Sequence, residues 1–189
     1  MGKRIVITGA PGVGKTTVIN GALDLLGREG ITYQSINFGT FMFETATAEG
    51  IVKDRDDMRK LDRSVQKHLQ QQAARGIARV EGNVIIDTHA SVKTPKGYLA
   101  GLPEWVLREL QPDIVVLVET DEDQILKRRL TDATRTRDMD TTKEILEHQQ
   151  FNRAIAAAYS MVTGCTVKVV KNQDYLLERA VTDMADALR

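Results

Sequence analysis

Residues 9–16 read Gly9-Ala10-Pro11-Gly12-Val13-Gly14-Lys15-Thr16 and match the pattern G-x-x-x-x-G-K-[ST] at every fixed position. The apolar run 5–7 precedes this stretch, and apolar residues at helical spacing follow it. Phosphate-binding loops with this pattern connect a buried strand to the following helix, and the same order is found here. Its glycines let successive backbone N–H groups point inward, and the helix N-terminus adds partial positive charge. The stretch therefore predicts a polyphosphate site.

The side chains of this loop suggest individual roles. Lys15 supplies a mobile cation for the outer phosphates, and the Thr16 hydroxyl is placed to bind the accompanying Mg²⁺. A glycine-rich turn without a ligand is the alternative, but the spacing, the Lys-Thr pair and the upstream strand all favour a phosphate loop. We expect contacts to the polyphosphate from Gly9, Ala10, Pro11, Gly12, Val13, Gly14, Lys15, Thr16 and Thr17.

Length, charge and cysteine content narrow the class of protein. The 189 residues are enough for one sizeable core, and 26 basic residues balance 26 acidic ones. A neutral chain does not favour nucleic acid as the main partner. The single cysteine, Cys165, predicts neither a disulfide nor a zinc site. Residues 1–8 resemble a strand rather than a signal peptide, and no apolar run is long enough for a membrane span. We expect a cytoplasmic protein without membrane or nucleic-acid partners.

Apolar runs alternate with helical patterns along most of the chain. This alternation predicts a three-layer α/β domain with a parallel sheet of about five strands. Nucleotide is then expected over the carboxyl ends of the strands. The expected strands are 5–8, 31–37, 83–87, 113–119 and 166–170, and the expected helices are 15–29, 103–110, 121–130, 141–163 and 174–188.

The alternation is interrupted once, by two helical patterns at 40–49 and 54–78 without a strand between them. This pair is either a lobe standing off the sheet or an ordinary surface hairpin of helices with a solvated charged face. We predict one domain over 1–189. Its parts are a core of 1–37, 80–127 and 141–189, a helical insertion at about 38–79, and a short lid at about 128–140.

Polar residues follow the expected strand 83–87. Asp87 ends that strand next to the phosphate loop, where a carboxylate organises Mg²⁺, directly or through water, or positions a substrate. His89 and Lys93 lie in the loop 88–97 on the same edge. Each is either a ligand for a substrate base or phosphate or a residue with a structural partner.

Five arginines lie in or near a stretch that is poor in apolar residues. We predict that Arg135 and Arg137 close on the transferring phosphoryl group as catalytic lid residues, and that Arg128 and Arg153 are further phosphate contacts. Alternatively, the lid arginines belong to a surface loop and pair with its aspartates. In the insertion, Arg59 is either a phosphate clamp or a solvated helix charge.

Six stretches resemble the archaeal type of adenylate kinase along nearly the whole chain. They are GAPGVGKTT, INFGTFMFE, DRDDMRKL, IIDTHASVKTPKGYLAGLP, RRLTDATRTRD and FNRAIAAAY. The fourth is the most family-specific, whereas the phosphate loop marks only the superfamily of P-loop NTPases. The resemblance implies reversible transfer from MgATP to AMP giving two ADP, ATP binding by residues 9–17, an insertion that binds the monophosphate, and a homotrimer.

The chain departs from the common bacterial and eukaryotic adenylate kinases at their AMP-binding motifs. Their G-D-x-x-R segment corresponds to residues 39–43 and their D-G-[FY]-P-R segment to residues 87–91, and both lack the arginine here. The lid also lacks zinc cysteines, so we expect no zinc. The expected AMP contacts are Gly39, Thr40, Arg59, Asp87, His89 and Lys93.

Other classes of P-loop protein remain as alternatives. Sequence spacing does not separate AMP from CMP, UMP or a deoxynucleotide as the acceptor, and a P-loop ATPase is a further alternative. A small GTPase would show D-x-x-G after the third strand and [NT]-K-x-D for guanine. Neither motif is present, because Asp87 is followed by Thr88-His89-Ala90 and the segment 171–174 reads Lys-Asn-Gln-Asp.

Overall fold

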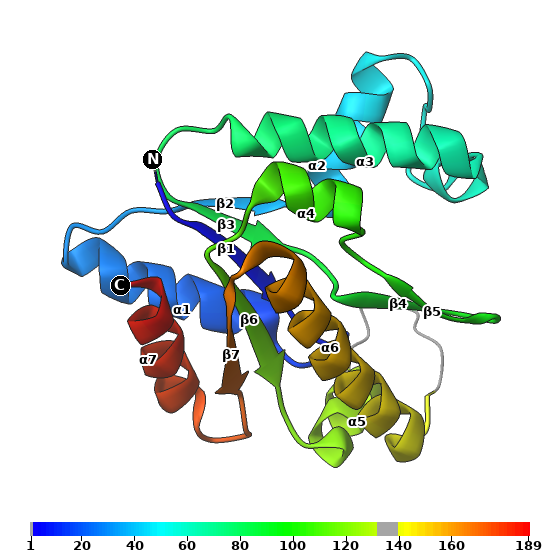
Figure 1. The fold of residues 1–189 in the computed structure, drawn as a ribbon. Helices are drawn as coiled ribbons and strands as arrows, with labels where there is room; N and C mark the ends of the chain where they lie inside the picture. The colour runs from blue at the N-terminus through cyan, green and yellow to red at the C-terminus, as the bar shows by residue number, and fades with distance from the viewer. Residues whose placement is uncertain (1, 132–139) are drawn as a thin grey trace.

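The computed structural model describes residues 2–131 and 140–189, without the side chain of Arg59. Its main sheet has five strands in the order β2-β3-β1-β6-β7 (Figure 1). Every pair of neighbours in this sheet is parallel, which confirms the predicted α/β fold with five parallel strands. The strands are β1 (Arg4–Thr8), β2 (Gln34–Asn37), β3 (Val84–Asp87), β6 (Ile114–Glu119) and β7 (Thr166–Lys171).

Helices cover both faces of the sheet and make three layers (Figure 1). Successive side chains of the central strand β1 enter opposite cores, as the two-residue period of a strand requires. Ile5 and Ile7 pack with α1 (Lys15–Arg28) and α7 (Leu177–Leu188). Val6 packs on the other face, with α3 (Arg63–Ala78), α4 (Glu104–Leu110) and α6 (Thr142–Thr163).

The segment between β2 and β3 is helical, but it differs from the expected pair of helices. It contains α2 (Phe38–Ala48), the 3₁₀ turn η1 (Asp57–Lys60) and α3. The prediction of one helix over 54–78 is wrong because the Asp54 carboxylate accepts hydrogen bonds from the N–H groups of Asp56 and Asp57. Such a side-chain turn competes with the first turn of a helix, and α3 begins only after Asp62.

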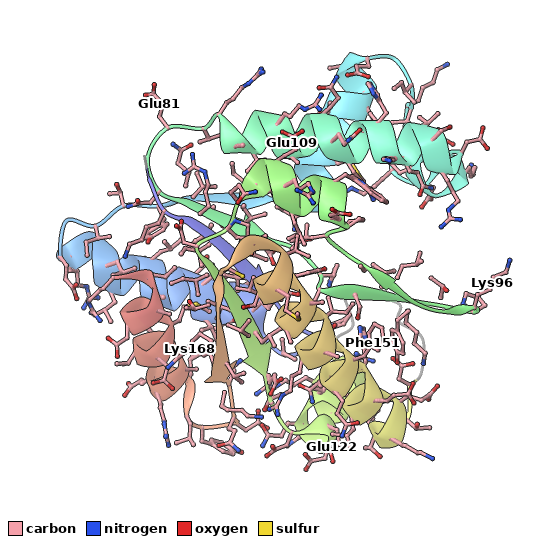
Figure 2. The ribbon with its side chains drawn as sticks, viewed as in Figure 1. Glu81, Lys96, Glu109, Glu122, Phe151 and Lys168 are labelled. Atoms are coloured by element: carbon pink, nitrogen blue, oxygen red, sulfur yellow. The ribbon has the colours of Figure 1, made fainter. Side chains whose placement is uncertain are left out.

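A hairpin that the sequence analysis treated as a loop leaves the sheet after β3. Its strands β4 (Ser91–Thr94) and β5 (Gly97–Ala100) pair antiparallel in a sheet of their own. It projects from the body of the molecule (Figure 1), with Lys96 at its tip and Phe151 of α6 beside it (Figure 2). The rings of Tyr98 and Phe151 stack with centroids 4.7 Å apart, which anchors the hairpin to α6.

The remaining helix, α5 (Glu122–Thr131), follows β6 and includes the first residues of the predicted lid at about 128–140. Helix α6 begins with a capping box formed by Thr141 and Glu144 and ends at Gly164, which has a φ of 78°. None of the helices in the described ranges is long and apolar enough to cross a membrane.

Candidate active site

The phosphate loop connects β1 to α1, and two of its glycines are needed for distinct reasons. At Gly9 an added Cβ would lie 2.4 Å from the carbonyl oxygen of Val118, so only glycine lets the loop pass this close to β6. Gly14 has a φ of 83° and is the N-cap of α1. A side chain there would be strained by the left-handed backbone. The loop geometry therefore depends on the glycine pattern that the sequence showed.

The carbonyl oxygen of Val13 is held from outside the loop by two side chains. Asn172 donates from Nδ2 at 2.7 Å, and Arg128 donates from Nη1 at 3.1 Å. The C=O and the N–H of a trans peptide point in opposite directions. These bonds therefore turn the N–H of Gly14 toward the inside of the loop. Asn172 is a positioning residue that sequence reasoning missed.

Arg129 holds a second carbonyl of the loop in the same way. Its Nε donates to the carbonyl oxygen of Pro11 at 2.8 Å, which turns the N–H of Gly12 inward. Its Nη1 lies 2.7 Å from a carboxylate oxygen of Asp140, the residue that precedes the α6 cap. Adjacent arginines of α5 thus orient the two loop peptides from outside.

Lys15 extends from α1 to the end of β3. Its Nζ lies 2.7 Å from Oδ1 of Asp87 and donates to the carbonyl oxygen of Thr88 at 2.8 Å. Both side chains are mostly buried, at 13% and 20% exposure. The structure therefore brings together the predicted lysine of the loop and the predicted aspartate of the strand end.

The oxygen donors at this place fit a magnesium ion. Oδ1 of Asp87 is buried against the Lys15 ammonium, and Thr16 lies on the exposed first turn of α1. Carboxylate and hydroxyl oxygens are ligands that Mg²⁺ prefers. The described ranges contain no group of three His, Cys, Asp or Glu side chains that could hold a metal alone.

The start of α2 is connected to Asp87 by hydrogen bonds. Asn37 donates from Nδ2 to Oδ2 of Asp87 at 3.3 Å, and its Oδ1 accepts from the N–H of Thr40 at 2.9 Å. The predicted residues Gly39 and Thr40 thus lie in the first turn of a helix that begins beside Asp87. Asn37, which makes the connection, was not predicted.

Arg55 is a further residue that was not among the predicted site residues. Its Nη2 donates to Oγ1 of Thr40 at 2.6 Å, and its guanidinium carbon lies 5.7 Å from the centroid of the Phe43 ring. Phe43 is the last residue of the segment 39–43, where the common bacterial and eukaryotic adenylate kinases have an arginine and this chain has none. The structure places a guanidinium beside that position from a different part of the chain.

His89 lies near Lys15, Asp87 and the backbone of Gly9. Burial lowers the pKa of its ring, the charge of Lys15 lowers it further, and Asp87 and a hydrogen bond with the Gly9 backbone oppose the shift. The residue keeps an exposed edge. A neutral imidazole at neutral pH therefore stands beside the phosphate loop, able to donate or accept a hydrogen bond.

Lys93 is placed at a different point, on the hairpin. Its Nζ lies 2.8 Å from Asp140 and 2.9 Å from Glu144, and these carboxylates raise its pKa. A hydrogen bond from the Thr141 backbone, together with Lys93, lowers the pKa of Glu144 to about 2. Lys93 therefore links the hairpin to the start of α6, and a role in AMP binding stays a prediction.

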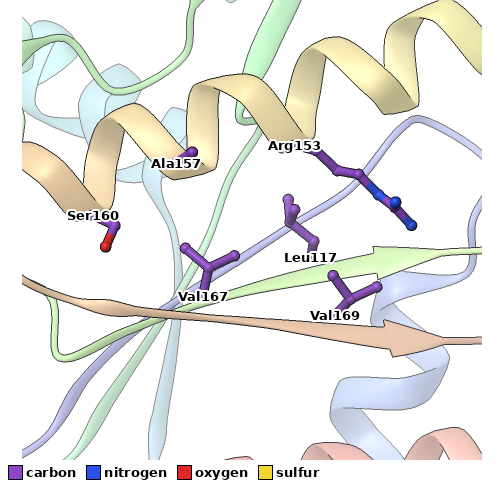
Figure 3. A pocket seen from close by; sticks show the side chains of 6 residues that line it. All are labelled: Leu117, Arg153, Ala157, Ser160, Val167 and Val169. Atoms are coloured by element: carbon purple, nitrogen blue, oxygen red, sulfur yellow. The ribbon is translucent and has the colours of Figure 1, made fainter.

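Arg153 is also paired away from the loop. Its Nε and Nη2 donate to the two oxygens of Glu119 at 2.7 and 2.6 Å. The side chain borders a cavity of about 450 Å³ between α6 and β7 (Figure 3). Its phosphate contact stays a prediction. The cavity is lined by Leu117, Arg153, Ala157, Ser160, Val167 and Val169.

Three of the predicted residues cannot be placed. Arg135 and Arg137 fall within residues 132–139, outside the described ranges, and the side chain of Arg59 is also outside the described part of the chain. The backbone of residue 59 belongs to η1.

The chain is similar in sequence to known proteins over its full length. A family model described as an AAA domain matches residues 8–146. An adenylate kinase from Methanoculleus marisnigri is 63% identical over 191 residues, which cover 100% of both chains. An adenylate kinase from Methanocaldococcus jannaschii is 52% identical over 189 residues, 99% of this chain and 98% of the relative. The chain belongs to the adenylate kinase family.

Solved structures with little sequence similarity share the fold of this adenylate kinase family member. A shikimate kinase from Bacteroides thetaiotaomicron has a TM-score of 0.60 at 14% identity, with 98% of each chain covered. A gluconokinase from Sinorhizobium meliloti has a TM-score of 0.55 at 15% identity, with 98% of this chain and 91% of that chain covered. At such low identity the comparison supports the architecture and not the substrate.

Proposed function

We propose that the chain transfers the γ-phosphoryl group of ATP reversibly to AMP and so forms two molecules of ADP. The observation that carries the proposal is the contact between Lys15 of the phosphate loop and Asp87 at the end of β3. It joins the donor loop to the strand end where an acceptor would bind. The adenylate kinase relatives, at 63% and 52% identity, support adenine nucleotides as the pair.

The loop binds the donor phosphates through its backbone N–H groups. Asn172, Arg128 and Arg129 have already oriented these groups by bonding the loop carbonyls from outside. Little reorganisation is then needed when the phosphates enter, and such preorganised donors stabilise charge more strongly than water does. Lys15 exchanges its contact with Asp87 for the outer phosphates of the donor. This exchange leaves the Asp87 carboxylate available to an ion or to the acceptor, so binding of the donor prepares the acceptor side.

Thr16 and Asp87 would hold the Mg²⁺ that accompanies ATP, Asp87 directly or through water. Bound Mg²⁺ neutralises charge on the transferring phosphoryl group. On the acceptor side, the start of α2 with Gly39 and Thr40, together with His89, positions AMP so that its phosphate oxygen approaches in line.

The remaining assignments have two sources. Residue patterns and composition support closure of Arg135 and Arg137 over the migrating group, a lid at about 128–140 and a cytoplasmic location. The family resemblance supports a monophosphate-binding insertion at about 38–79 and assembly as a homotrimer. Sedimentation equilibrium tests the assembly independently of activity.

A coupled assay with ATP and each of AMP, CMP, UMP and GMP tests the reaction. Turnover with AMP alone, with two ADP formed for each ATP consumed, is the expected result. Preference for CMP or UMP would assign another nucleoside monophosphate kinase. Hydrolysis of ATP without any acceptor would move the chain to the ATPases.

A further inference from the structure

The chain passes from the end of β3 into the hairpin within a few residues. Asp87 contacts the Lys15 ammonium, and the carbonyl oxygen of Thr88 accepts a hydrogen bond from the same ammonium at 2.8 Å. Ala90 and Ser91, which follow shortly after, are buried, at 1% and 3% exposure. The part of this segment that faces the reaction is therefore short, and its position depends on what holds the residues that come next.

A tyrosine of α6 holds Ala90. The hydroxyl of Tyr159 donates to the carbonyl oxygen of Ala90 at 2.7 Å and accepts from the N–H of Leu102 at 2.9 Å. Tyr159 is 3% exposed, and burial raises its pKa to about 12, so the hydroxyl keeps its proton. A single buried hydroxyl thus connects the residue before β4 to a residue just after β5.

A second polar contact from α6 holds Ser91. The Oγ of Ser91 donates to Oδ1 of Asn152 at 2.6 Å and lies 3.1 Å from Nε2 of His148. Asn152 and His148 are 3% and 6% exposed. Together with Tyr159 these residues are spaced by four and seven positions, which places them on one face of α6.

This polar face of α6 is costly to bury and gives direction in return. Buried polar groups lower stability unless each one is hydrogen-bonded. Apolar residues such as Ile145 and Ala156, which are buried along the same helix, pack without that cost. Apolar contacts are non-directional, however, whereas a hydrogen bond fixes the distance and angle of an oxygen atom. The polar face therefore fixes the backbone of residues 90 and 91 in a way that apolar packing would not.

We infer that Tyr159 is a positioning residue for phosphoryl transfer, because its bond to Ala90 fixes the backbone that presents His89 to the acceptor. Asn152 acts in the same way through Ser91. The inference rests on the proposed function, since it concerns the acceptor side of that reaction.

The exchange proposed for Lys15 makes this support important. When Lys15 moves to the donor phosphates, the segment loses its contacts to Asp87 and to the Thr88 carbonyl. The bonds from α6 involve no nucleotide, so they hold the segment both before and after the donor binds.

Steady-state kinetics of Tyr159→Phe test the inference, because the substitution removes the hydroxyl and keeps the ring. The KM for AMP should rise roughly 3- to 10-fold, the effect of one lost hydrogen bond, while the KM for ATP stays within about twofold. Tyr33→Phe is the matched control. Tyr33 also donates to a backbone carbonyl, that of Leu188 at 2.6 Å, but it precedes β2 and so lies at the end of the sheet opposite the site. It should lose stability without a change in either KM.

Ser91→Ala tests the same inference through the second contact. It removes the hydroxyl that Asn152 holds and should also raise the KM for AMP, whether or not Tyr159→Phe folds. Amide hydrogen exchange adds a readout without turnover. The N–H of Thr88, which donates to the carbonyl oxygen of Ile7, should exchange faster in both variants than in Tyr33→Phe.

The outcomes separate this inference from the proposed reaction. An unchanged KM for AMP in the variants that fold, or an equal rise in Tyr33→Phe, would overturn the inference. An equal rise in the KM for ATP would also overturn it, since the effect would not be specific to the acceptor side. Failure of the unaltered chain to phosphorylate AMP would overturn the proposed function instead.

Discussion

Asn172 bonds a loop residue that lies 159 positions away in the sequence. It is 5% exposed, and its Nδ2 lies 2.6 Å from the place that a Cβ on Gly14 would occupy. The same contact thus fixes the Val13 carbonyl and excludes a side chain at Gly14. A single amide at the end of β7 contributes to the shape of the phosphate site.

Asn172→Asp should weaken ATP binding. The substitution keeps the side-chain volume, removes the donor and brings a negative charge to the Val13 carbonyl. We expect the free energy of unfolding to fall by about 1 to 3 kcal/mol and the KM for ATP to rise about tenfold, with the KM for AMP unchanged. Urea unfolding and steady-state kinetics measure both effects.

Asn83→Asp is the matched control for this substitution. Asn83 also donates from Nδ2 to a backbone carbonyl, that of Thr32, at 3.2 Å, but at the opposite end of the sheet. It should lose stability without a change in either KM. An equal rise in the KM for ATP in both variants would mean that Asn172 acts only through overall stability.

Two glycines of α1 test how this helix packs on α7. A Cβ at Gly21 would lie 2.6 Å from Cγ2 of Val181, whereas a Cβ at Gly27 would have no atom of the described residues within 4 Å. Gly27→Ala should therefore stabilise the protein by about 0.5 to 1 kcal/mol through helix propensity. Gly21→Ala should be destabilising, because overpacking costs about 1 to 3 kcal/mol and outweighs that gain.

The midpoint of urea unfolding distinguishes the two glycine variants. A higher midpoint for Gly27→Ala and a lower one for Gly21→Ala are expected relative to the unaltered chain. If both midpoints rose together, the close contact between α1 and α7 would not be present in solution.

Glu119 connects three elements and makes stability depend on pH. Burial alone would raise its pKa, but Arg153 of α6 and Lys171 of β7 outweigh burial and lower it below the ordinary 4.5. A lowered folded-state pKa means that the unfolded chain binds more protons. The contribution of Glu119 is therefore complete above about pH 4.5 and is lost as the pH falls through the folded-state pKa.

Glu119→Gln should remove this dependence. At pH 7 we expect a loss of about 1 to 2 kcal/mol, the lower part of the range for charged hydrogen bonds, because both cationic partners are half exposed. Chemical unfolding between pH 7 and pH 3 should show the difference from the unaltered chain shrinking below pH 4.5. Glu104→Gln, in an exposed pair with Arg108, is the control. A difference that stays constant with pH would contradict the account.

At the scale of the whole molecule, local sequence patterns predicted the parallel sheet and the phosphate loop. They did so because a buried strand, a glycine pattern and a helix start are each encoded within a few residues. The prediction of one helix over 54–78 was wrong because the Asp54 carboxylate accepts hydrogen bonds from two backbone N–H groups. This side-chain turn competes with helix formation, and the spacing of apolar residues does not reveal it. The β4–β5 hairpin was missed because its polar strands are stabilised by packing on α6.

The parts of the site that were missed depend on contacts between distant segments. Asn172 reaches the loop from the last strand, and Arg55 returns to Thr40 from beyond the end of α2. Neither residue belongs to a motif, so only the fold brings them to the site. Lys93 is the opposite case. Its place in a polar loop suggested that it binds the substrate, whereas in the fold it pairs with the carboxylates of Asp140 and Glu144.

The central claim is that two nucleotides meet end to end beside Lys15 and Asp87, with the donor phosphates in the phosphate loop. Diadenosine pentaphosphate carries an adenosine at each end of one polyphosphate and would span both positions, and its binding can be followed by calorimetry and amide hydrogen exchange. We predict one molecule per chain, competition with both ATP and AMP, and protection of residues 9–17 together with the start of α2. Competition with only one nucleotide, or protection confined to residues remote from the phosphate loop, would contradict the account.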